Sequence, residues 1–118
     1  MKRIFYLASC STCQKILKTV KPGKDVVLQN IKEETITPDQ LDAMKKLAGS
    51  YEALFSKRSM KFRAWNLHEK ELTEKEMRDL ILKEYTFLKR PVAVINDQIF
   101  VGNTKIAVDG LKHALKEK

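Results

Sequence analysis

The sequence predicts an α/β fold whose elements follow the order β-α-β, then several helices, then β-β-α. Three observations carry this prediction. A short apolar run, Arg3–Leu7, is followed closely by a helical pattern. Capping-box motifs mark helices in the middle of the chain. Near the C-terminus, two β-rich runs are joined by Asn96-Asp97, which is typical of a hairpin.

The first part of the chain predicts a β-α-β unit. Arg3–Leu7 is apolar without alternation, which predicts a strand covered on both faces. Within Cys10–Val20, apolar side chains recur at the spacing of one helical turn, and Pro22-Gly23 ends this helix. Val26-Val27-Leu28 then predicts the second strand of the unit.

The middle of the chain predicts helices. Thr37-Pro38-Asp39-Gln40 and Thr73-Glu74-Lys75-Glu76 are both capping boxes, and each precedes apolar residues at helical spacing. Tyr51–Phe55 and Met60–Leu67 predict two short helices between them. We therefore expect a helical insertion at about residues 31–88.

The C-terminal part predicts a hairpin and a final helix. Val92–Ile95 and Gln98–Val101 are the two strands, because two turn-forming residues separate them. Thr104–Lys116 is the last helix, and its expected buried side consists of Ile106, Leu111, Ala114 and Leu115. Because no linker interrupts the chain, we expect one domain over residues 1–118.

Composition and charge exclude several classes of protein. Hydrophobic residues make up 43% of the 118 residues, a globular balance, and no apolar run approaches the roughly 18 residues of a membrane span. The apolar run after Met1 is too short for a secretory signal, so we expect a cytoplasmic protein with no membrane partner. The net charge of +8 fits a solvated lysine-rich surface or one that attracts anions and acidic partners. Because no DNA-binding motif is present, direct nucleic-acid binding is not expected.

The two cysteines of the chain lie three positions apart, in Cys10-Ser11-Thr12-Cys13. This segment follows the first strand and opens the first helix, where free backbone N–H groups and the helix dipole favour an anion. A thiolate is such an anion, so we expect Cys10 to have a lowered pKa and to act as a nucleophile. Cys13, one turn deeper, would be the shielded partner that resolves an intermediate formed on Cys10.

Two other interpretations of the cysteine pair remain open. One is half of a zinc site, which needs two more ligands. His68 and His113 are the available histidines, and they lack metal-like spacing, so we expect no bound metal. The other is a pair of inert, buried thiols.

Arg90-Pro91 stands immediately before the hairpin. In thioredoxin-like folds a cis proline at this point lies beside the reactive cysteine, and X–Pro bonds adopt cis at modest cost. We expect the Arg90–Pro91 bond to be cis and the guanidinium to face Cys10, where planar bidentate donors suit an oxyanion. The alternatives are a proline that is simply tolerated at a strand start and a plain surface arginine.

With these residues the chain resembles the arsenate reductase ArsC/Spx family over essentially its whole length. Cys10 matches the reactive cysteine of that family, and Arg90-Pro91 matches its Arg-Pro motif. The resemblance implies a thioredoxin-like fold without a bound cofactor, a small oxyanion or thiol substrate, and a redox protein as partner. It also implies reduction of arsenate to arsenite, with glutathione and glutaredoxin, or thioredoxin, as electron donor.

The resemblance is not the same for both branches of the family. Arsenate reductases of this type usually carry arginine where this chain has Ser56 and Gly102, and Arg58 is a candidate to compensate. A second cysteine at the position of Cys13 resembles the Spx branch of the family. Members of that branch bind the α subunit of RNA polymerase and use the dithiol as a redox switch. A redox-sensing regulator is therefore the alternative to a reductase. The expected site combines catalytic residues and oxyanion-binding residues: Cys10, Cys13 and Arg90 with Ser11, Thr12, Arg58 and Pro91.

Overall fold

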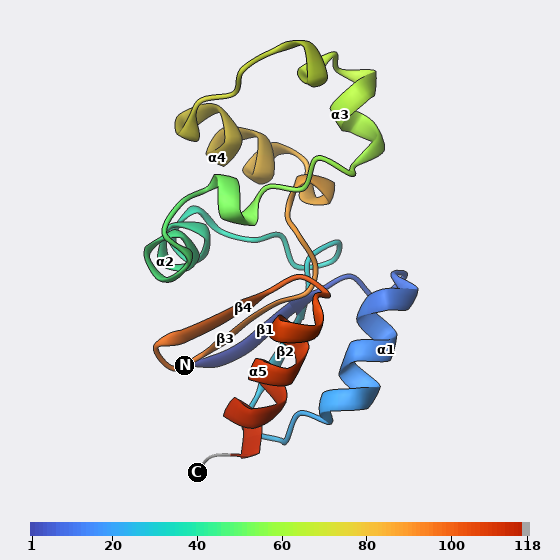
Figure 1. The fold of residues 1–118 in the computed structure, drawn as a ribbon, viewed down its shortest axis with the longest axis vertical. Coiled ribbons are helices and arrows are strands. Elements are labelled where there is room, and N and C mark those ends of the chain that lie inside the picture. The colour runs from blue at the N-terminus through green and yellow to red at the C-terminus, as the bar shows by residue number, and fades with distance from the viewer. Residues whose placement is uncertain (117–118) are drawn as a thin grey trace. The chain divides into compact units, whose positions relative to one another are not determined.

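The computed structural model describes residues 1–116, and its contacts divide the chain into two compact units. The first unit joins Met1–Thr35 to the residues from Arg90 onward, and the second is Ile36–Lys89. Figure 1 shows the elements of both units. One domain over 1–118 stays a prediction. Among residues 1–116, no helix is long and apolar enough to cross a membrane.

The first unit is built on a four-stranded sheet in the order β2-β1-β3-β4. β1 pairs in parallel with β2 and antiparallel with β3, and β3 pairs antiparallel with β4. These pairings confirm the predicted β-α-β and hairpin units. The strands are β1 (Lys2–Tyr6), β2 (Val27–Asn30), β3 (Val92–Ile95) and β4 (Gln98–Val101).

The strand register determines which loops share one end of the sheet. Phe5 of β1 pairs with Val92, and Val92 pairs with Val101 of β4. The segments that follow β1 and β4, and the segment that precedes β3, therefore leave the sheet at the same end. We call this end, where Tyr6, Val92 and Val101 lie, the Tyr6 end.

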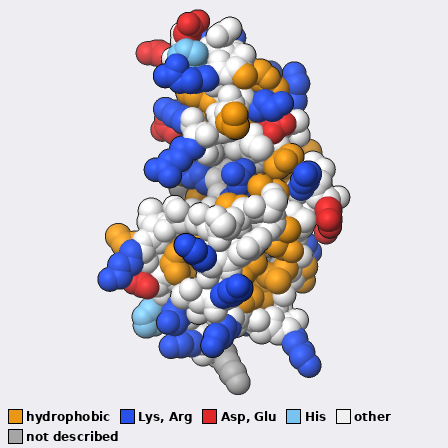
Figure 2. Space-filling view, turned by 90° about the vertical axis from the view of Figure 1, so that its right-hand side faces the viewer, with side chains coloured by type: hydrophobic (Ala, Val, Ile, Leu, Met, Phe, Trp, Pro, Cys, Tyr) orange, Lys and Arg blue, Asp and Glu red, His pale blue; other side chains and the backbone are white. Residues whose placement is uncertain are grey.

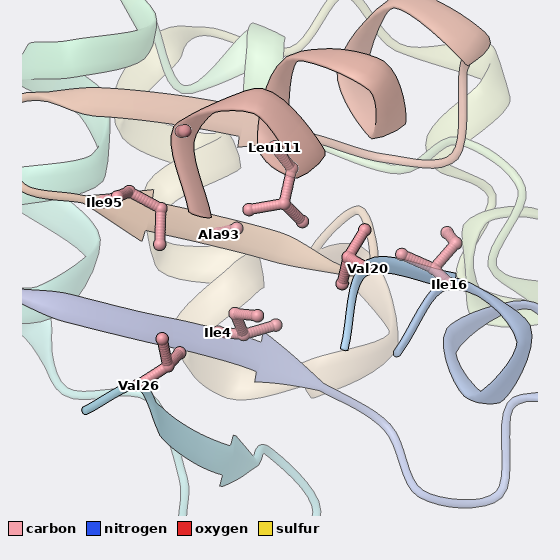
Figure 3. Packing of buried hydrophobic residues seen from close by; sticks show 8 residues of the cluster. Ile4, Ile16, Val20, Val26, Ala93, Ile95 and Leu111 are labelled. Atoms are coloured by element: carbon pink, nitrogen blue, oxygen red, sulfur yellow. The ribbon is translucent and has the colours of Figure 1, made fainter. Parts of the chain in front are cut away.

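Helices α1 (Ser11–Val20) and α5 (Lys105–Lys116) cover one face of the sheet, and both begin at the Tyr6 end (Figure 1). Their apolar sides meet the strands in one buried cluster. Ile16 and Val20 of α1 and Leu111 of α5 point toward the strand residues (Figure 3). The buried members from the sheet side are Ile4, Val26, Ala93 and Ile95.

The turns of this unit follow the sequence, but one core prediction is wrong. Asn96 has a φ of 58°, which a hairpin turn between β3 and β4 requires, so the predicted turn is confirmed. Ile106, expected on the buried side of the last helix, is 87% exposed. It lies five residues before the buried Leu111, and at about 100° per residue that places it on a different side of α5.

The second unit contains three α-helices joined by short 3-10 turns. Both predicted capping boxes are confirmed. The hydroxyl oxygens of Thr37 and Thr73 each accept a hydrogen bond from the backbone N–H of the third helical residue, and the backbone N–H of each threonine donates to the side chain of that same residue. The helices are α2 (Pro38–Ala48), α3 (Met60–Ala64) and α4 (Glu74–Lys83), and the 3-10 turns are Glu52–Leu54, Leu67–Glu69 and Tyr85–Phe87.

Aromatic side chains form the core near α3. The Phe55 and Phe87 rings are stacked with centroids 5.2 Å apart, and the edge of Trp65 meets Phe87 at 5.5 Å. Trp65 itself is 36% exposed, so it covers the rim of this core rather than filling it.

Three polar side chains of the second unit, Arg78, Asp42 and Tyr51, are joined by hydrogen bonds, and we call this group the polar clamp. Arg78 of α4 donates two hydrogen bonds to the Asp42 carboxylate of α2, at 2.8 and 3.1 Å, and the Tyr51 hydroxyl donates a third at 2.6 Å. The hydrogen bond and charge of Arg78, with the Tyr51 bond, lower the pKa of Asp42 to about 2. The bidentate geometry holds α2 and α4 in a fixed relation.

We expect this clamp to make the second unit sensitive to acid. The folded-state pKa of Asp42 is depressed, so its stabilising contribution is complete above an unfolded pKa of about 3.9 and is lost as the pH falls toward about 2. Arg78→Ala should lower the urea unfolding midpoint at pH 7 and flatten its decline between about pH 4 and 2. Lys75→Ala, at an exposed position of the same helix, is the control. An equal decline with and without Arg78 would contradict this role.

Candidate active site

The sequence places Cys10 at the N-cap of α1. Its backbone N–H donates to the Leu7 carbonyl at 3.0 Å, and its own carbonyl accepts from the N–H of Gln14 at 3.1 Å, which opens the helix. No acidic residue occupies the first turn of α1. The thiol therefore lies at the positive end of the helix dipole, as the sequence predicted.

The surroundings of Cys10 favour its thiolate. Partial burial, the largest single influence, raises its pKa. Hydrogen bonds from the Cys13 backbone and thiol and from the Thr12 backbone lower it, as does the charge of Arg90. Together they outweigh the burial, so the pKa of Cys10 lies below its ordinary value. This is the direction expected for a nucleophilic cysteine.

Cys13 has the opposite character. Its side chain is completely buried, and this burial is the main cause that raises its pKa to about 11. The Leu7 backbone acts in the other direction, while the neighbouring Cys10 raises the pKa further by its hydrogen bond and charge. Both cysteines are free thiols. The pair thus combines an accessible, acidic thiol with a shielded, protonated one, as predicted.

Arg90 and Pro91 lie next to this pair. The Arg90–Pro91 peptide bond is cis, which confirms the sequence prediction. The charge of Arg90 lowers the pKa of both thiols, so the guanidinium is within electrostatic reach of the dithiol. Its Nη1 atom is buried and makes no hydrogen bond to residues 1–116. Whether this nitrogen donates to an oxyanion at Cys10 stays a prediction.

Three residues hold the loops of the site by contacts that the sequence did not predict. The Gln14 amide donates to the Ala8 carbonyl at 2.7 Å, and Asn30 Oδ1 accepts from the Ala8 backbone N–H at 3.4 Å. Gly102, with a φ of +82°, donates its N–H to the Pro91 carbonyl at 2.8 Å. The sequence alone does not predict these hydrogen bonds, because they depend on how the segments pack.

The remaining predicted site residues are Ser11, Thr12 and Arg58. Ser11 is exposed and Thr12 is half-buried, both in the first turn of α1. Arg58 belongs to the second unit, where it is exposed in the turn before α3, so its part in oxyanion binding stays a prediction. Within residues 1–116, no group of three or more His, Cys, Asp and Glu side chains could hold a metal ion.

We expect Arg90→Ala to affect oxyanion chemistry more than thiol acidity. Among the causes that lower the pKa of Cys10, the Arg90 charge is the smallest, so this pKa should rise only modestly. A hydrogen bond to a charged group is worth about 1.5–3 kcal/mol, so reaction of Cys10 with an oxyanion should slow roughly tenfold to a hundredfold. Single-turnover kinetics with arsenate, beside an alkylation pH profile, measure the two effects.

The conservative variant separates charge from geometry. Arg90→Lys should restore the thiol pKa but only part of the oxyanion reactivity, since an ammonium lacks the planar fork. Arg58→Ala tests the other candidate arginine and should weaken oxyanion reactivity without shifting the thiol pKa. Unchanged kinetics in Arg90→Ala would mean that Arg-Pro serves only as the turn before β3.

Solved structures with the same architecture include three proteins at low sequence identity. SACOL0876 from Staphylococcus aureus COL has 24% identity and a TM-score of 0.75, and the match covers 93% of this chain and 97% of that chain. An arsenate reductase (ArsC) related protein from Brucella melitensis has 22% identity and a TM-score of 0.70, with 92% of each chain covered. The arsenate reductase from Vibrio cholerae has 17% identity and a TM-score of 0.73, with 97% of each chain covered. A comparison with curated proteins finds no significant match. At these identities the likeness shows the fold alone.

The sheet order, the dithiol at the start of α1 and the cis proline before β3 define a protein of the thioredoxin-like fold. The structural neighbours agree with that class. The profile of the ArsC family matches residues 5–109, and the chain belongs to this family.

Proposed function

We propose that this protein is a thiol-dependent reductase that uses Cys10 as nucleophile on a small oxyanion, with arsenate as the first substrate to test. Membership of the ArsC family supports a reductase-like role. The observation that carries the proposal is the pairing of an acidified, partly exposed Cys10 with a buried Cys13 of pKa about 11. Such a pair suits attack by one thiol and resolution by the other.

The proposed chemistry proceeds in two steps. The Cys10 thiolate attacks the oxyanion centre, arsenic(V) in arsenate, and displaces one oxygen as water after protonation. A sulfur–arsenic bond forms, and Arg90 balances the charge of the remaining oxygens. Cys13 then attacks Cys10 Sγ, the sulfur–arsenic electron pair leaves with arsenic as arsenite, and a Cys10–Cys13 disulfide forms. Two thiols are oxidised and arsenic is reduced by two electrons.

The coupling between the thiols assists the second step. While Cys10 is a thiolate, its hydrogen bond and charge help to keep Cys13 protonated. Once Cys10 Sγ is bonded to the oxyanion, it no longer carries that charge. The pKa of Cys13 then falls, although burial still raises it, so Cys13 loses its proton more readily at the stage where it must attack.

An arsenate turnover assay tests this proposal. NADPH consumption is followed with two donor systems, glutathione with glutaredoxin and thioredoxin with its reductase. Turnover with either donor that vanishes in Cys10→Ser supports the reductase. Cys13→Ser should abolish thioredoxin-driven turnover, whereas glutathione could replace Cys13 as the resolving thiol.

A redox-sensing regulator that binds the α subunit of RNA polymerase is the second candidate. It is favoured by Gly102, whose φ of +82° disfavours the arginine that arsenate reductases of this type usually carry there. Absence of turnover with both donors, together with capture of the α subunit by the oxidised chain, would favour this candidate. The cytoplasm is the location we propose for either function, because thiols stay reduced there.

A further inference from the structure

The second unit contains a pocket lined by residues of α3, the start of α4 and the neighbouring 3-10 turns. Its volume is about 520 Å³, within the range of about 300–1,000 Å³ that is typical of small-molecule sites. All of its lining residues belong to the second unit, whereas Cys10, Cys13 and Arg90 belong to the first. The chemistry of the dithiol therefore does not account for this pocket.

Three apolar side chains line part of the pocket, and we call them the apolar wall. Phe62 and Leu72 are half-buried and Met77 is buried. Leu72 precedes the N-cap Thr73, and Met77 is the fourth residue of α4; these two positions pair in a hydrophobic staple. The His68 ring also lines the pocket, with its centroid 6.5 Å from that of Phe62.

Contacts within the second unit hold the pocket in shape. The Glu74 carboxylate at the start of α4 accepts hydrogen bonds from the backbone N–H groups of Tyr51 and Glu52, at 2.8 and 3.0 Å. On the other side, the edge of the Phe62 ring meets the buried Phe55 ring with centroids 6.2 Å apart. The pocket is therefore formed by the fold itself, which lowers the cost of binding a ligand.

Charged side chains of both signs line the same pocket. They are Lys57 and Lys70 on the one hand and Glu52 and Glu71 on the other. Within residues 1–116, none of these four side chains takes part in an ion pair. On the face drawn in Figure 2, side chains of both charges lie beside hydrophobic ones over the second unit. A purely anionic ligand would meet the two carboxylates, and a purely cationic one the two ammonium groups.

We propose that this pocket binds a small zwitterion with an apolar side chain, which is the chemistry shared by apolar α-amino acids and short apolar peptides. Glu52 and Glu71 bind the ammonium group of the ligand, Lys57 and Lys70 bind its carboxylate, and the apolar wall covers its side chain. The complementary charges give specificity and the apolar contact gives affinity. The inference goes beyond the proposed reductase and does not depend on it.

The first test uses the unmodified chain and a set of ligands. Leucyl-leucine is titrated while NMR follows the Met77 methyl and Phe62 ring signals. Glycylglycine keeps both charges without the apolar side chains, and N-acetyl-leucyl-leucinamide keeps the side chains without the charges. Each should bind about tenfold more weakly or worse, since apolar burial is lost in the first and two ion pairs in the second.

Free leucine distinguishes the two sources of the ligand. Binding tighter than that of leucyl-leucine would assign the pocket to an amino acid, and weaker binding would assign it to a peptide. The NMR signals of the apolar wall should shift in either case, because both ligands place a leucine side chain against it.

Charge variants test each end of the ligand separately. Lys57→Gln/Lys70→Gln should weaken binding of leucyl-leucine about fivefold, and it should not weaken binding of leucyl-leucinamide, which has no carboxylate. Glu52→Gln/Glu71→Gln should weaken binding of leucyl-leucine to a similar extent, and it should not weaken binding of N-acetyl-leucyl-leucine, which has no ammonium group.

A matched control changes two lysines of the first unit. Lys24 and Lys32 are exposed there, so Lys24→Gln/Lys32→Gln removes the same charge away from the pocket and should leave binding of leucyl-leucine unchanged. Three results would overturn the proposal: no shift of the Phe62 and Met77 signals up to about 10 mM leucyl-leucine, equal affinity for the charged and uncharged ligands, or equal losses in the control and the pocket variants. None of these readouts involves Cys10, so the reductase proposal would stand.

Discussion

Iodoacetamide should label Cys10 at least about a hundred times faster than Cys13 at neutral pH. The thiolate is the reacting form, so each labelling rate follows its pKa. The pKa of Cys13 is raised to about 11, whereas that of Cys10 is lowered from its ordinary value of 9.0. More than two units separate them, and burial of Cys13 slows its labelling further.

The measurement is alkylation over a range of pH, with each cysteine quantified by mass spectrometry. The Cys10 rate should rise with pH to a plateau whose midpoint lies below that of a free thiol. The Cys13 rate should keep rising up to pH 9.5. Cys13→Ser removes one of the hydrogen bonds that stabilise the Cys10 thiolate, so the Cys10 midpoint should move upward. Preferential labelling of Cys13 would reverse the assignment of roles.

The second prediction with a large expected effect concerns formation of a disulfide between Cys10 and Cys13. A mild oxidant should convert the two free thiols of each chain into one intramolecular disulfide, which dithiothreitol reverses. The thiols already share a hydrogen bond, so their sulfur atoms lie close together within the first turn of α1. Thiol counting and intact mass should show the loss of two thiols and of about two mass units, with no dimer.

The single variants identify the disulfide. Cys13→Ser should leave Cys10 to form intermolecular dimers or mixed disulfides, since its thiol is partly exposed. Cys10→Ser should leave a buried thiol that the oxidant barely reaches. Oxidised original chain that runs mainly as dimers, or that keeps both thiols, would contradict the resolving role of Cys13.

Local signals made most of the first unit predictable, and a strand followed by Cys-x-x-Cys places Cys10 at a helix N-terminus. The cis Arg90–Pro91 bond was predicted from the position of the proline before the hairpin together with what is typical of thioredoxin-like folds. Gln14 and Asn30 could not be predicted to hold the Ala8–Cys10 loop, because those hydrogen bonds exist only after β2 and α1 have packed.

The error at Ile106 has a different origin. The last helix has several apolar residues, and spacing alone can assign more of them to one face than that face holds. The half-buried Val108 packs against the same cluster as Leu111, one turn before it, which leaves Ile106 outside. The contribution of Arg58 could not be derived either, because charge and position in a turn do not determine which anion a flexible side chain binds.

The burial of Cys13 also determines the order in which oxidising equivalents enter the protein. A peroxide or electrophile meets Cys10 first, because Cys13 has no surface to offer it. A sulfenic acid formed on Cys10 then faces a thiol held in the same helical turn, where intramolecular reactions reach effective molarities of up to about 10⁵–10⁸ M. Capture by Cys13 should therefore outrun a second oxidation to the irreversible sulfinic acid. We therefore expect Cys13 to protect Cys10 from irreversible oxidation without help from small thiols.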